Sequence, residues 1–238
     1  MAQGRCLLLG GLILATLVAS SAAAPAAPHA AGKACHGVNL LSAPYFATGI
    51  GDVVLDVSEP VDGRVICQHV SRRSGYSASA RAKRSCENAR TPGFRLRPKI
   101  AAASIRCLFD KIRGNHGLRR LSPQDNLKKA AKRHTDNMLS LGCFAHQCAG
   151  EPDLVGRVTA TGYLPCVCTW SVGENLAWGI RRRATPAAIV DAWMASPPHR
   201  EMILMGAMRD VDVGIKGGAP GSGTSKAATY TADFGVKN

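Results

Sequence analysis

Three short segments each place an ionisable side chain beside large apolar or aromatic neighbours. They are FAHQC (144–148), GENLAWG (173–179) and WMASPPHR (193–200), and their ionisable residues are His146, Glu174 and His199. Imidazole groups bind metal ions and exchange protons near neutral pH, and carboxylates can do both. Taken singly, each residue has a plainer interpretation: a histidine near a core is usually a hydrogen-bonded structural residue, and a glutamate after a glycine usually begins a helix. The combination, in this order along the chain, is more specific.

Ser196 and His199 raise the question of a serine nucleophile. A serine and a histidine attack a carbonyl when a third group orients the histidine. However, Ser196 begins the run Ser-Pro-Pro, which is typical of a helix N-cap. No G-x-S-x-G motif is present. The favoured interpretation of Ser196 is therefore a cap.

The neighbours of these residues are expected to be structural. Asn175 is predicted to turn or cap the chain after Glu174. Trp178 and Trp193 are predicted to be core anchors, because apolar residues recur at helical spacing around Trp193.

The elements that must position these residues are mostly helical from residue 100 onward. Apolar periodicity and Ser-Pro or Thr-Pro start signals predict them. The predicted helices are 100–114, Ser122–Pro123 to Gly142, 151–162, one opening at Thr185–Pro186 and one opening at Ser196–Pro197. After these, residues 211–215 and 228–234 alternate apolar and small or polar side chains across a glycine-rich loop, which predicts a strand pair. Helices followed by antiparallel strands give one α+β domain, residues 100–237.

The N-terminus predicts export. Arg5 precedes the apolar run 6–19, and small residues follow it. This is the plan of a secretory signal peptide, here residues 1–24 with cleavage near Ala23 or Ala24. The run is shorter than the ~20 apolar residues of a bilayer span, so we expect cleavage and no transmembrane anchor.

Eight cysteines remain after the signal peptide, and an even number in an exported chain points to disulfides. They are Cys35, Cys67, Cys86, Cys107, Cys143, Cys148, Cys166 and Cys168. The spacing does not give their connectivity. Zinc is the alternative for the close pairs at 143–148 and 166–168, although oxidised, exported thiols rarely hold it.

Residues 25–70 form an N-terminal region of unknown fold. Two segments within it, 51–58 and 63–70, alternate well enough to be strands, and Cys35 and Cys67 could staple them. Nothing in this region indicates chemistry.

The chain carries a net charge of +14, and much of the excess lies in 71–99. That segment has few large apolar residues and is interpreted as an exposed basic linker. It is either a solvated spacer or a segment attracted to an anionic cell wall, a membrane surface or lipid head groups. The run RRRA at 181–184 is a solvated turn that could add to such a patch. Nucleic acid is the least supported partner, because the chain is exported and has no recognised binding motif.

Taken together, these segments resemble the CAP superfamily (cysteine-rich secretory proteins, antigen 5 and pathogenesis-related 1), or SCP domain, and more narrowly its exported bacterial members. The resemblance rests on CLFDKIRGNHGLRRLS (107–122), LKKAAKRHTDNM (127–138), FAH (144–146), GENLAWG (173–179), IVDAWMASPPHREMIL (189–204), VDVGI (211–215) and YTADFG (230–235). It implies a three-layer α-β-α sandwich with an antiparallel sheet. It also favours a Cys86–Cys107 disulfide and makes Cys143–Cys148 plausible.

The family pattern lines a broad cleft with two histidines and two glutamates. His146, Glu174 and His199 match three of these, but Ser196 stands where the second glutamate is expected. Two imidazoles and a carboxylate suit a divalent metal, with zinc the natural choice. They also suit a general acid–base pair or a structural hydrogen-bond network.

The resemblance implies a secreted binding module for a lipid or cell-surface ligand. The alternatives are an extracellular peptidase or cell-wall hydrolase using the same cleft, and a disulfide-stabilised scaffold whose basic segment binds surfaces.

Overall fold

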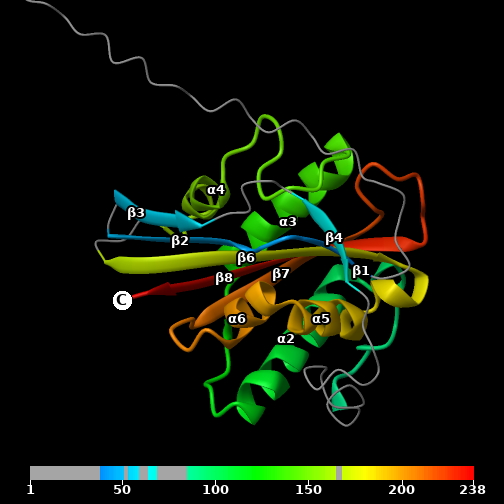
Figure 1. Cartoon of the computed structure of the whole chain (residues 1–238), viewed down its shortest axis with the longest axis horizontal. Coiled ribbons are helices and arrows are strands. Elements are labelled where there is room, and N and C mark those ends of the chain that lie inside the picture. Colours follow the sequence, from blue (N-terminus) through cyan, green and yellow to red (C-terminus); the bar gives the residue numbers. More distant parts are fainter. Residues whose placement is uncertain (1–37, 51–52, 59–63, 69–84, 165–167) are drawn as a thin grey trace, which may run out of the picture.

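A single eight-stranded sheet organises the protein, with helices on both of its faces (Figure 1). The computed structural model describes residues 38–50, 53–58, 64–68, 85–164 and 168–238. The strand order along the main path is β3-β2-β6-β8-β7-β5. Helices α3 and α4 lie on one face of the sheet, and α2, α5 and α6 lie on the other. The predicted α+β class and α-β-α sandwich are confirmed.

Three antiparallel strands form the middle of the sheet: β6 (Thr169–Ile180), β8 (Ala227–Lys237) and β7 (Asp210–Gly217). The last two are the predicted C-terminal strand pair. Ten of the eleven residues of β8 are buried, because helices cover both faces. The sheet is antiparallel except for a short parallel pairing of β5 (Ser122–Pro123) with β7.

Four strands precede the helices: β1 (Val38–Leu41), β2 (Tyr45–Ile50), β3 (Val53–Ser58) and β4 (Val65–Gln68). The last two confirm the strands predicted within 51–58 and 63–70. The whole of β2 pairs with β6, and β1 pairs with β6 further along. The N-terminal strands are therefore part of the main sheet.

Helices α2 (Pro98–Asn115) and α5 (Pro186–Ala195) form where the sequence predicts them. Each has a proline in its first turn, where a missing N–H costs no hydrogen bond. The Thr185 hydroxyl accepts the N–H of Ala188 at 3.2 Å, so the Thr-Pro signal does begin α5. Both predicted core anchors, Trp178 and Trp193, are buried.

The start of α3 (Asp125–Leu141) differs from the prediction of Ser122–Pro123. The N–H of Ser122 donates to the carbonyl of Arg209, which holds Ser122 and Pro123 as strand β5. Gln124 caps the helix instead, and its side-chain oxygen accepts the N–H of Asn126. The helix ends at Gly142 as expected, in the left-handed conformation with φ 64°.

Two helices are short. Helix α4 (Leu154–Ala160) begins later than the predicted residue 151, because the Asp153 side chain accepts the N–H of Gly156 and caps it there. Helix α6 (Pro197–Leu204) follows Ser196, and the carbonyls of Ile203 and Met205 at its end both accept hydrogen bonds from the buried guanidinium of Arg113.

Part of the predicted basic linker is packed structure. A disulfide joins Cys86 to Cys107 in α2, and η1 (Gly93–Arg95) lies against the sheet. Residues 85–97 are therefore not an exposed spacer, because the disulfide and the buried Ala89 anchor them. Residues 69–84 and the predicted signal peptide lie outside the described residues.

The second predicted disulfide, Cys143–Cys148, is also present, so those sulfurs are not free thiolates for zinc. Cys67 and Cys168 are disulfide-bonded as well. Cys35 and Cys166 lie outside the described residues, so the proposed Cys35–Cys67 pairing stays a prediction.

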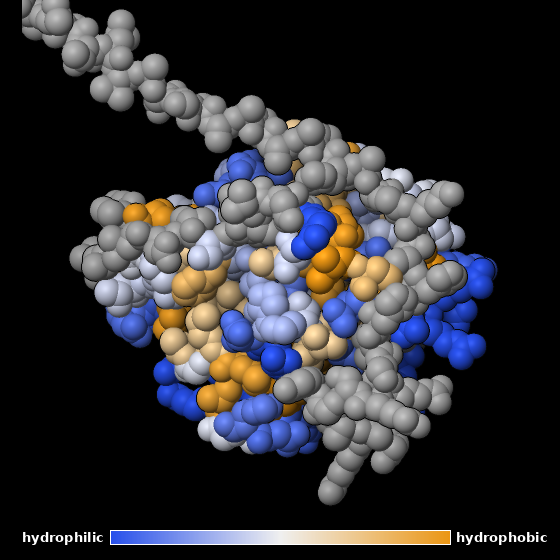
Figure 2. Space-filling model, in the orientation of Figure 1, coloured by the Kyte–Doolittle hydropathy of each residue, from blue (hydrophilic) through white to orange (hydrophobic). Residues whose placement is uncertain are grey.

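Few large apolar side chains are exposed. Among the described residues they are Val54, Ile100 and Leu141. On the face in Figure 2, apolar residues (orange) lie between hydrophilic ones (blue). No helix of the described ranges is long and apolar enough to cross a bilayer.

Candidate functional site

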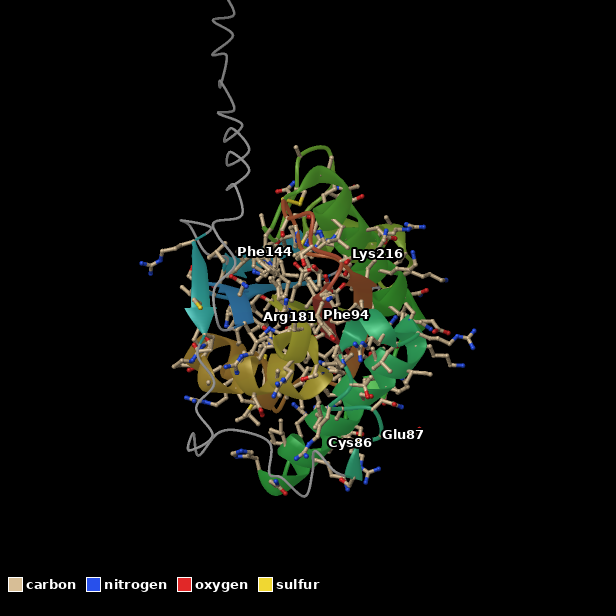
Figure 3. The ribbon with its side chains drawn as sticks, turned by 90° about the vertical axis from the view of Figure 1, so that its right-hand side faces the viewer. Cys86, Glu87, Phe94, Phe144, Arg181 and Lys216 are labelled. Carbon is tan, nitrogen blue, oxygen red and sulfur yellow. A yellow bond between two sulfur atoms is a disulfide. The ribbon has the colours of Figure 1, made fainter. Side chains whose placement is uncertain are left out.

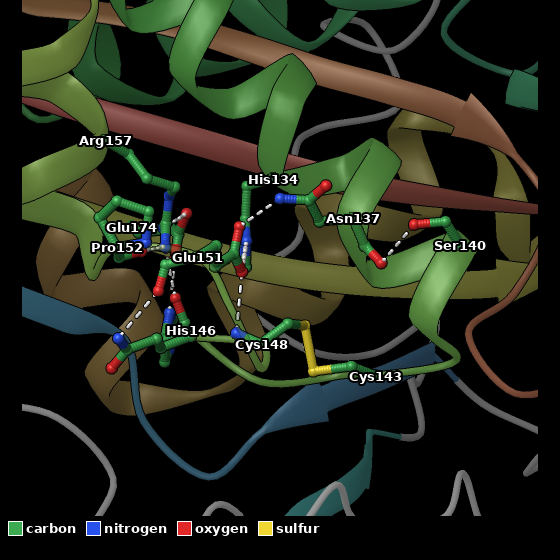
Figure 4. The surroundings of a disulfide bond; sticks show 11 residues. His134, Asn137, Ser140, Cys143, His146, Cys148, Glu151, Pro152, Arg157 and Glu174 are labelled. Atoms are coloured by element: carbon green, nitrogen blue, oxygen red, sulfur yellow. Dashed lines mark hydrogen bonds and ion pairs between the residues drawn. A yellow bond between two sulfur atoms is a disulfide. The ribbon is translucent and has the colours of Figure 1, made fainter. Parts of the chain in front are cut away.

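Glu174 lies in the middle of the central strand β6 and is fully buried (Figure 4). His146 belongs to the segment that the Cys143–Cys148 disulfide closes, and its Nδ1 donates to Oε1 of Glu174 at 2.7 Å. Nη2 of Arg157, from α4, donates to Oε2 of Glu174 at 2.6 Å. The carboxylate is thus held by one imidazole and one guanidinium.

A second buried acid lies beside the first. Oε1 of Glu151 accepts from Nδ1 of His134 at 2.7 Å and from the N–H of Cys148 at 2.8 Å. Its Oε2 accepts from the amide of Asn137 at 2.8 Å. Nε2 of His134 lies 3.8 Å from Oε1 of Glu174, so this ring stands between the two carboxylates. We call the five residues the buried acid cluster: Glu174, His146, Arg157, His134 and Glu151.

Neighbouring cations and hydrogen-bond donors lower the pKa of both acids. Burial alone would raise the pKa of Glu174, but the Arg157 guanidinium and the two nearby imidazoles hold it well below its usual range. Burial opposes ionisation of Glu151 too, but the hydrogen bonds from His134, Asn137 and Cys148 lower its pKa. Both groups are therefore carboxylates at neutral pH.

Asp233 of β8 lies directly opposite Glu174 in the antiparallel register. It is fully buried, and its side-chain oxygens have no hydrogen-bond partner among the described residues. Burial raises the pKa of Asp233 well above its usual value, and the negative charge of Glu174 raises it further. A protonated, neutral Asp233 avoids an unpaired buried charge beside the ion pair of Glu174 and Arg157.

His199 and Ser196 form a separate pair. Nδ1 of His199 lies 2.8 Å from Oγ of Ser196, and both residues are buried. Ser196 stands at the N-cap of α6, but its side chain makes no capping hydrogen bond to the backbone, because it binds this ring instead. Burial, with a smaller effect of His146, lowers the pKa of His199 to about 3, so the ring is neutral near pH 7.

The structure brings the predicted His146 to Glu174, but the second imidazole beside this carboxylate is His134 and not the predicted His199. Among the described residues, no hydrogen bond or ion pair joins His199 to Glu174 or to His146. The prediction for Asn175 is wrong: it lies inside β6, and its Nδ2 donates to the carbonyl of His199 at 3.1 Å.

The N-terminal strands cover the cluster. Nε2 of His146 donates to the carbonyl of Ala43 at 3.1 Å, and the Tyr45 ring lies 6.0 Å from the His146 ring between centroids. His146 is 4% exposed and Glu174 is 0% exposed. Both ring nitrogens of His146 therefore face acceptor oxygens.

This arrangement does not fit a divalent metal ion. Arg157 and His146 take the two oxygens of Glu174, and both ring nitrogens of His146 face acceptor oxygens. A metal ligand must present a free lone pair, and a guanidinium beside the carboxylate competes with a cation for the same oxygen. The described ranges contain no group of three His, Cys, Asp or Glu side chains placed to hold a metal.

Sequence reasoning missed four members of this region: Arg157, His134, Glu151 and Asp233. His134 did carry a signal, because it lies on the inner face of α3 among apolar residues. Arg157 stands at the middle of a short helix and is only 5% exposed, whereas arginine is usually exposed. No pattern in the chain distinguishes it from a solvated arginine.

Comparison with known proteins agrees with the fold. The model of the cysteine-rich secretory protein family, CAP, matches residues 108–234. A search of curated proteins gave no match.

Three solved bacterial structures are similar to the chain. One is an extracellular protein containing an SCP domain from Bacillus anthracis, with 21% identity over 58% of this chain and 43% of that one and a TM-score of 0.45. Another is an outer surface protein from Borrelia burgdorferi, with 21% identity, 55% and 87% coverage and a TM-score of 0.43. The third is a cysteine-rich secretory protein from Staphylococcus aureus, with 17% identity, 58% and 38% coverage and a TM-score of 0.41. The chain therefore spans less than half of the first and third of these proteins.

Proposed function

The chain belongs to the cysteine-rich secretory protein (CAP) family, and from this premise we propose that it is an exported binding module that acts outside the cytoplasm or at the cell envelope. Its ligand is a lipid or another component of a cell surface. The apolar N-terminal run, the eight cysteines that follow the predicted signal peptide, and the disulfides Cys86–Cys107 and Cys143–Cys148 support export.

We favour binding over catalysis because the residues of the acid cluster are buried and already paired with one another. A general acid or base must reach the proton that it transfers, directly or through one water molecule. Glu174 is 0% exposed and has both oxygens occupied, and His146 is covered by Ala43 and Tyr45. We propose that the cluster fixes the relative positions of α3, α4, β2 and β6, and that ligands bind elsewhere on the surface.

A screen of peptidase and esterase substrates tests this proposal, with the wild type compared with His146→Ala. We expect no turnover by either protein. Turnover by the wild type that His146→Ala abolishes would show that the cluster is catalytic. Gln147→Ala is the matched control, because it changes the adjacent residue without touching the carboxylate of Glu174.

The divalent cation predicted for His146, Glu174 and His199 is tested separately by calorimetric titration with zinc. Since Arg157 occupies Glu174, we expect no heat beyond dilution. Binding of one zinc ion per chain that is lost in His146→Ala would instead require the N-terminal cover and Arg157 to move away.

A serine hydrolase is the second candidate, and one observation favours it: Oγ of Ser196 lies 2.8 Å from Nδ1 of His199. This is the distance between a nucleophile and its base. Burial counts against it, because Ser196 is only 3% exposed. A fluorophosphonate probe, which labels activated serines, tests this candidate. Labelling of the wild type that disappears in Ser196→Ala would establish Ser196 as a nucleophile. Absence of labelling of the wild type would exclude the serine hydrolase.

A further inference from the structure

A hollow of about 450 Å³ lies between η1, η2 (Arg181–Ala184) and the residue before β8. Among its seven lining residues in the described part of the chain, five are cations and none is an acid. The cations are Arg90, Arg95, Arg181, Arg182 and Lys226. We call this hollow the basic pocket. Its volume falls within the ~300–1,000 Å³ of small-molecule sites.

The other two lining residues, Pro92 and Phe94, are apolar and half-buried. In Figure 3, the labelled Phe94 and Arg181 lie next to each other on the face turned to the viewer. The basic pocket thus offers a cationic rim and an apolar wall.

Rigid contacts hold the two sides of the basic pocket together. The Cys86–Cys107 disulfide and a hydrogen bond of 2.8 Å from the N–H of Ala187 to the carbonyl of Ala89 fix the segment that leads to Arg90. Gly93 packs so closely on Tyr230 that a Cβ there would collide with the tyrosine hydroxyl. The backbone on these sides of the basic pocket is therefore held in place without a ligand, which lowers the entropic cost of binding.

No acid of the described ranges neutralises the five cations. Among the described residues, none of them has an ion pair or a side-chain hydrogen bond, and only Arg95 has a ring contact, at 5.8 Å from the centroid of Phe94. Positive charges gathered in one hollow repel each other, so an anion is favoured there.

Arg181 is also held in a strained conformation. Its φ is 51°, in the left-handed region that residues other than glycine and asparagine rarely adopt. Its N–H donates to the carbonyl of Lys226 at 2.7 Å, which fixes this backbone at the pocket edge. Strain of this kind is often found at functional sites.

From these observations we infer that the basic pocket binds a phosphate monoester whose organic group packs against Pro92 and Phe94. The planar guanidinium groups match phosphate oxygens in pairs, and several cations in one pocket favour a dianion over a singly charged carboxylate. This inference deepens the proposed binding function, on which it rests, by naming a ligand chemistry and a place remote from the buried acid cluster.

The phosphate monoester has two possible sources, a soluble metabolite or a lipid head group, and two probes separate them. The soluble probe is phenyl phosphate, measured by isothermal titration with benzoate as the singly charged comparison. The membrane probe is co-sedimentation with phosphatidylcholine vesicles containing phosphatidic acid, compared with vesicles in which phosphatidylglycerol supplies a diester of single charge.

The variant is the double substitution Arg90→Gln and Arg182→Gln, and its matched control is Lys111→Gln with Arg133→Gln. Both pairs are exposed and remove two positive charges, but the control residues do not line the basic pocket. We expect the pocket variant to bind phenyl phosphate or phosphatidic acid vesicles at least about tenfold more weakly than the control.

Binding of phenyl phosphate alone supports a soluble phosphate monoester, binding of the vesicles alone supports a lipid head group, and binding of both supports the shared phosphate chemistry from either source. Equal affinities of the two variants overturn the inference, because net charge alone would then explain the binding. The inference is also overturned if neither probe binds, or if benzoate binds as tightly as phenyl phosphate. None of these results depends on the hydrolysis screen, so the inference can fail while the absence of catalysis stands.

Discussion

The carbonyl oxygen of Ala43 lies 3.1 Å from Nε2 of His146, although the two residues are 103 positions apart. This contact covers a residue that the family resemblance places in a broad cleft. The turn between β1 and β2 reaches it because β2 pairs along β6, with Tyr45 directly opposite Glu174. The N-terminal strands therefore complete the core of the domain and seal its ionisable centre.

The first prediction follows from Tyr45, which is 2% exposed and packs beside His146. Tyr45→Ala should lower the free energy of unfolding by about 3 kcal/mol, since it leaves a cavity in a buried cluster. Val54→Ala on the neighbouring strand is the control, because Val54 is 44% exposed and should cost less than about 0.5 kcal/mol. Urea denaturation measures both, and equal values would mean that β2 is not part of the cooperative core.

A second prediction concerns the buried ion pair of Arg157 and Glu174. Arg157→Met leaves a carboxylate without its main cation and should cost about 3 kcal/mol or more. The double variant Arg157→Met with Glu174→Gln should recover part of that loss, because no unpaired charge remains. Lys132→Ala removes the exposed ion pair with Asp136 and should cost at most about 0.5 kcal/mol. A double variant no more stable than Arg157→Met alone would argue against this account.

His199 gives a prediction for pH. Its pKa is about 3 when folded and near 6.5 when unfolded, so below pH 6.5 the unfolded chain binds a proton that the folded chain excludes. The stability present above pH 6.5 is therefore lost as the pH falls towards 3, at up to ~1.4 kcal/mol per pH unit. His199→Asn should flatten this slope.

The measurement is urea denaturation of wild type and His199→Asn between pH 7 and 5.5. The lowered pKa values of Glu174 and Glu151 also reduce stability in acid, but carboxylates in an unfolded chain take up protons mainly below this window. His116 is exposed and is the control histidine, so His116→Asn should keep the wild-type slope. Parallel slopes for wild type and His199→Asn would show that the imidazole is not excluded from protonation.

The sequence predicted most elements of the domain but not the central strand. Helical spacing of apolar residues identified α2, a Thr-Pro start signal identified α5, and larger apolar side chains at every second position identified β7 and β8. Nine of the twelve residues of β6 are buried, eight of them in succession from residue 172 to 179, so the strand lacks the alternation that identifies a half-buried strand, and the prediction of a turn or cap at Asn175 is wrong.

Only part of the acid cluster could be predicted, because only some of its residues lie in a recognisable local pattern. Glu174 and His146 were found because their segments combine an ionisable group with aromatic neighbours in a known order. No such combination surrounds Arg157. An isolated arginine in a helix is expected to be exposed to solvent, and only the packing shows that this one is buried. The cover by Ala43 depends on strand pairing across more than a hundred residues, which no local pattern reports.

The last prediction separates stability from binding at Arg181. Glycine adopts a φ of 51° without the steric cost of a Cβ, so Arg181→Gly should stabilise the fold by about 1 kcal/mol or leave it unchanged. The same change removes one cation from the basic pocket and should weaken binding of phenyl phosphate or phosphatidic acid vesicles. Arg182→Gly is the matched control: its φ is not in the left-handed region, so it should weaken binding but also lower stability by about 0.5–1 kcal/mol. Thermal denaturation and titration on both variants test this, and a destabilised Arg181→Gly that binds normally would mean that Arg181 serves the fold rather than a ligand.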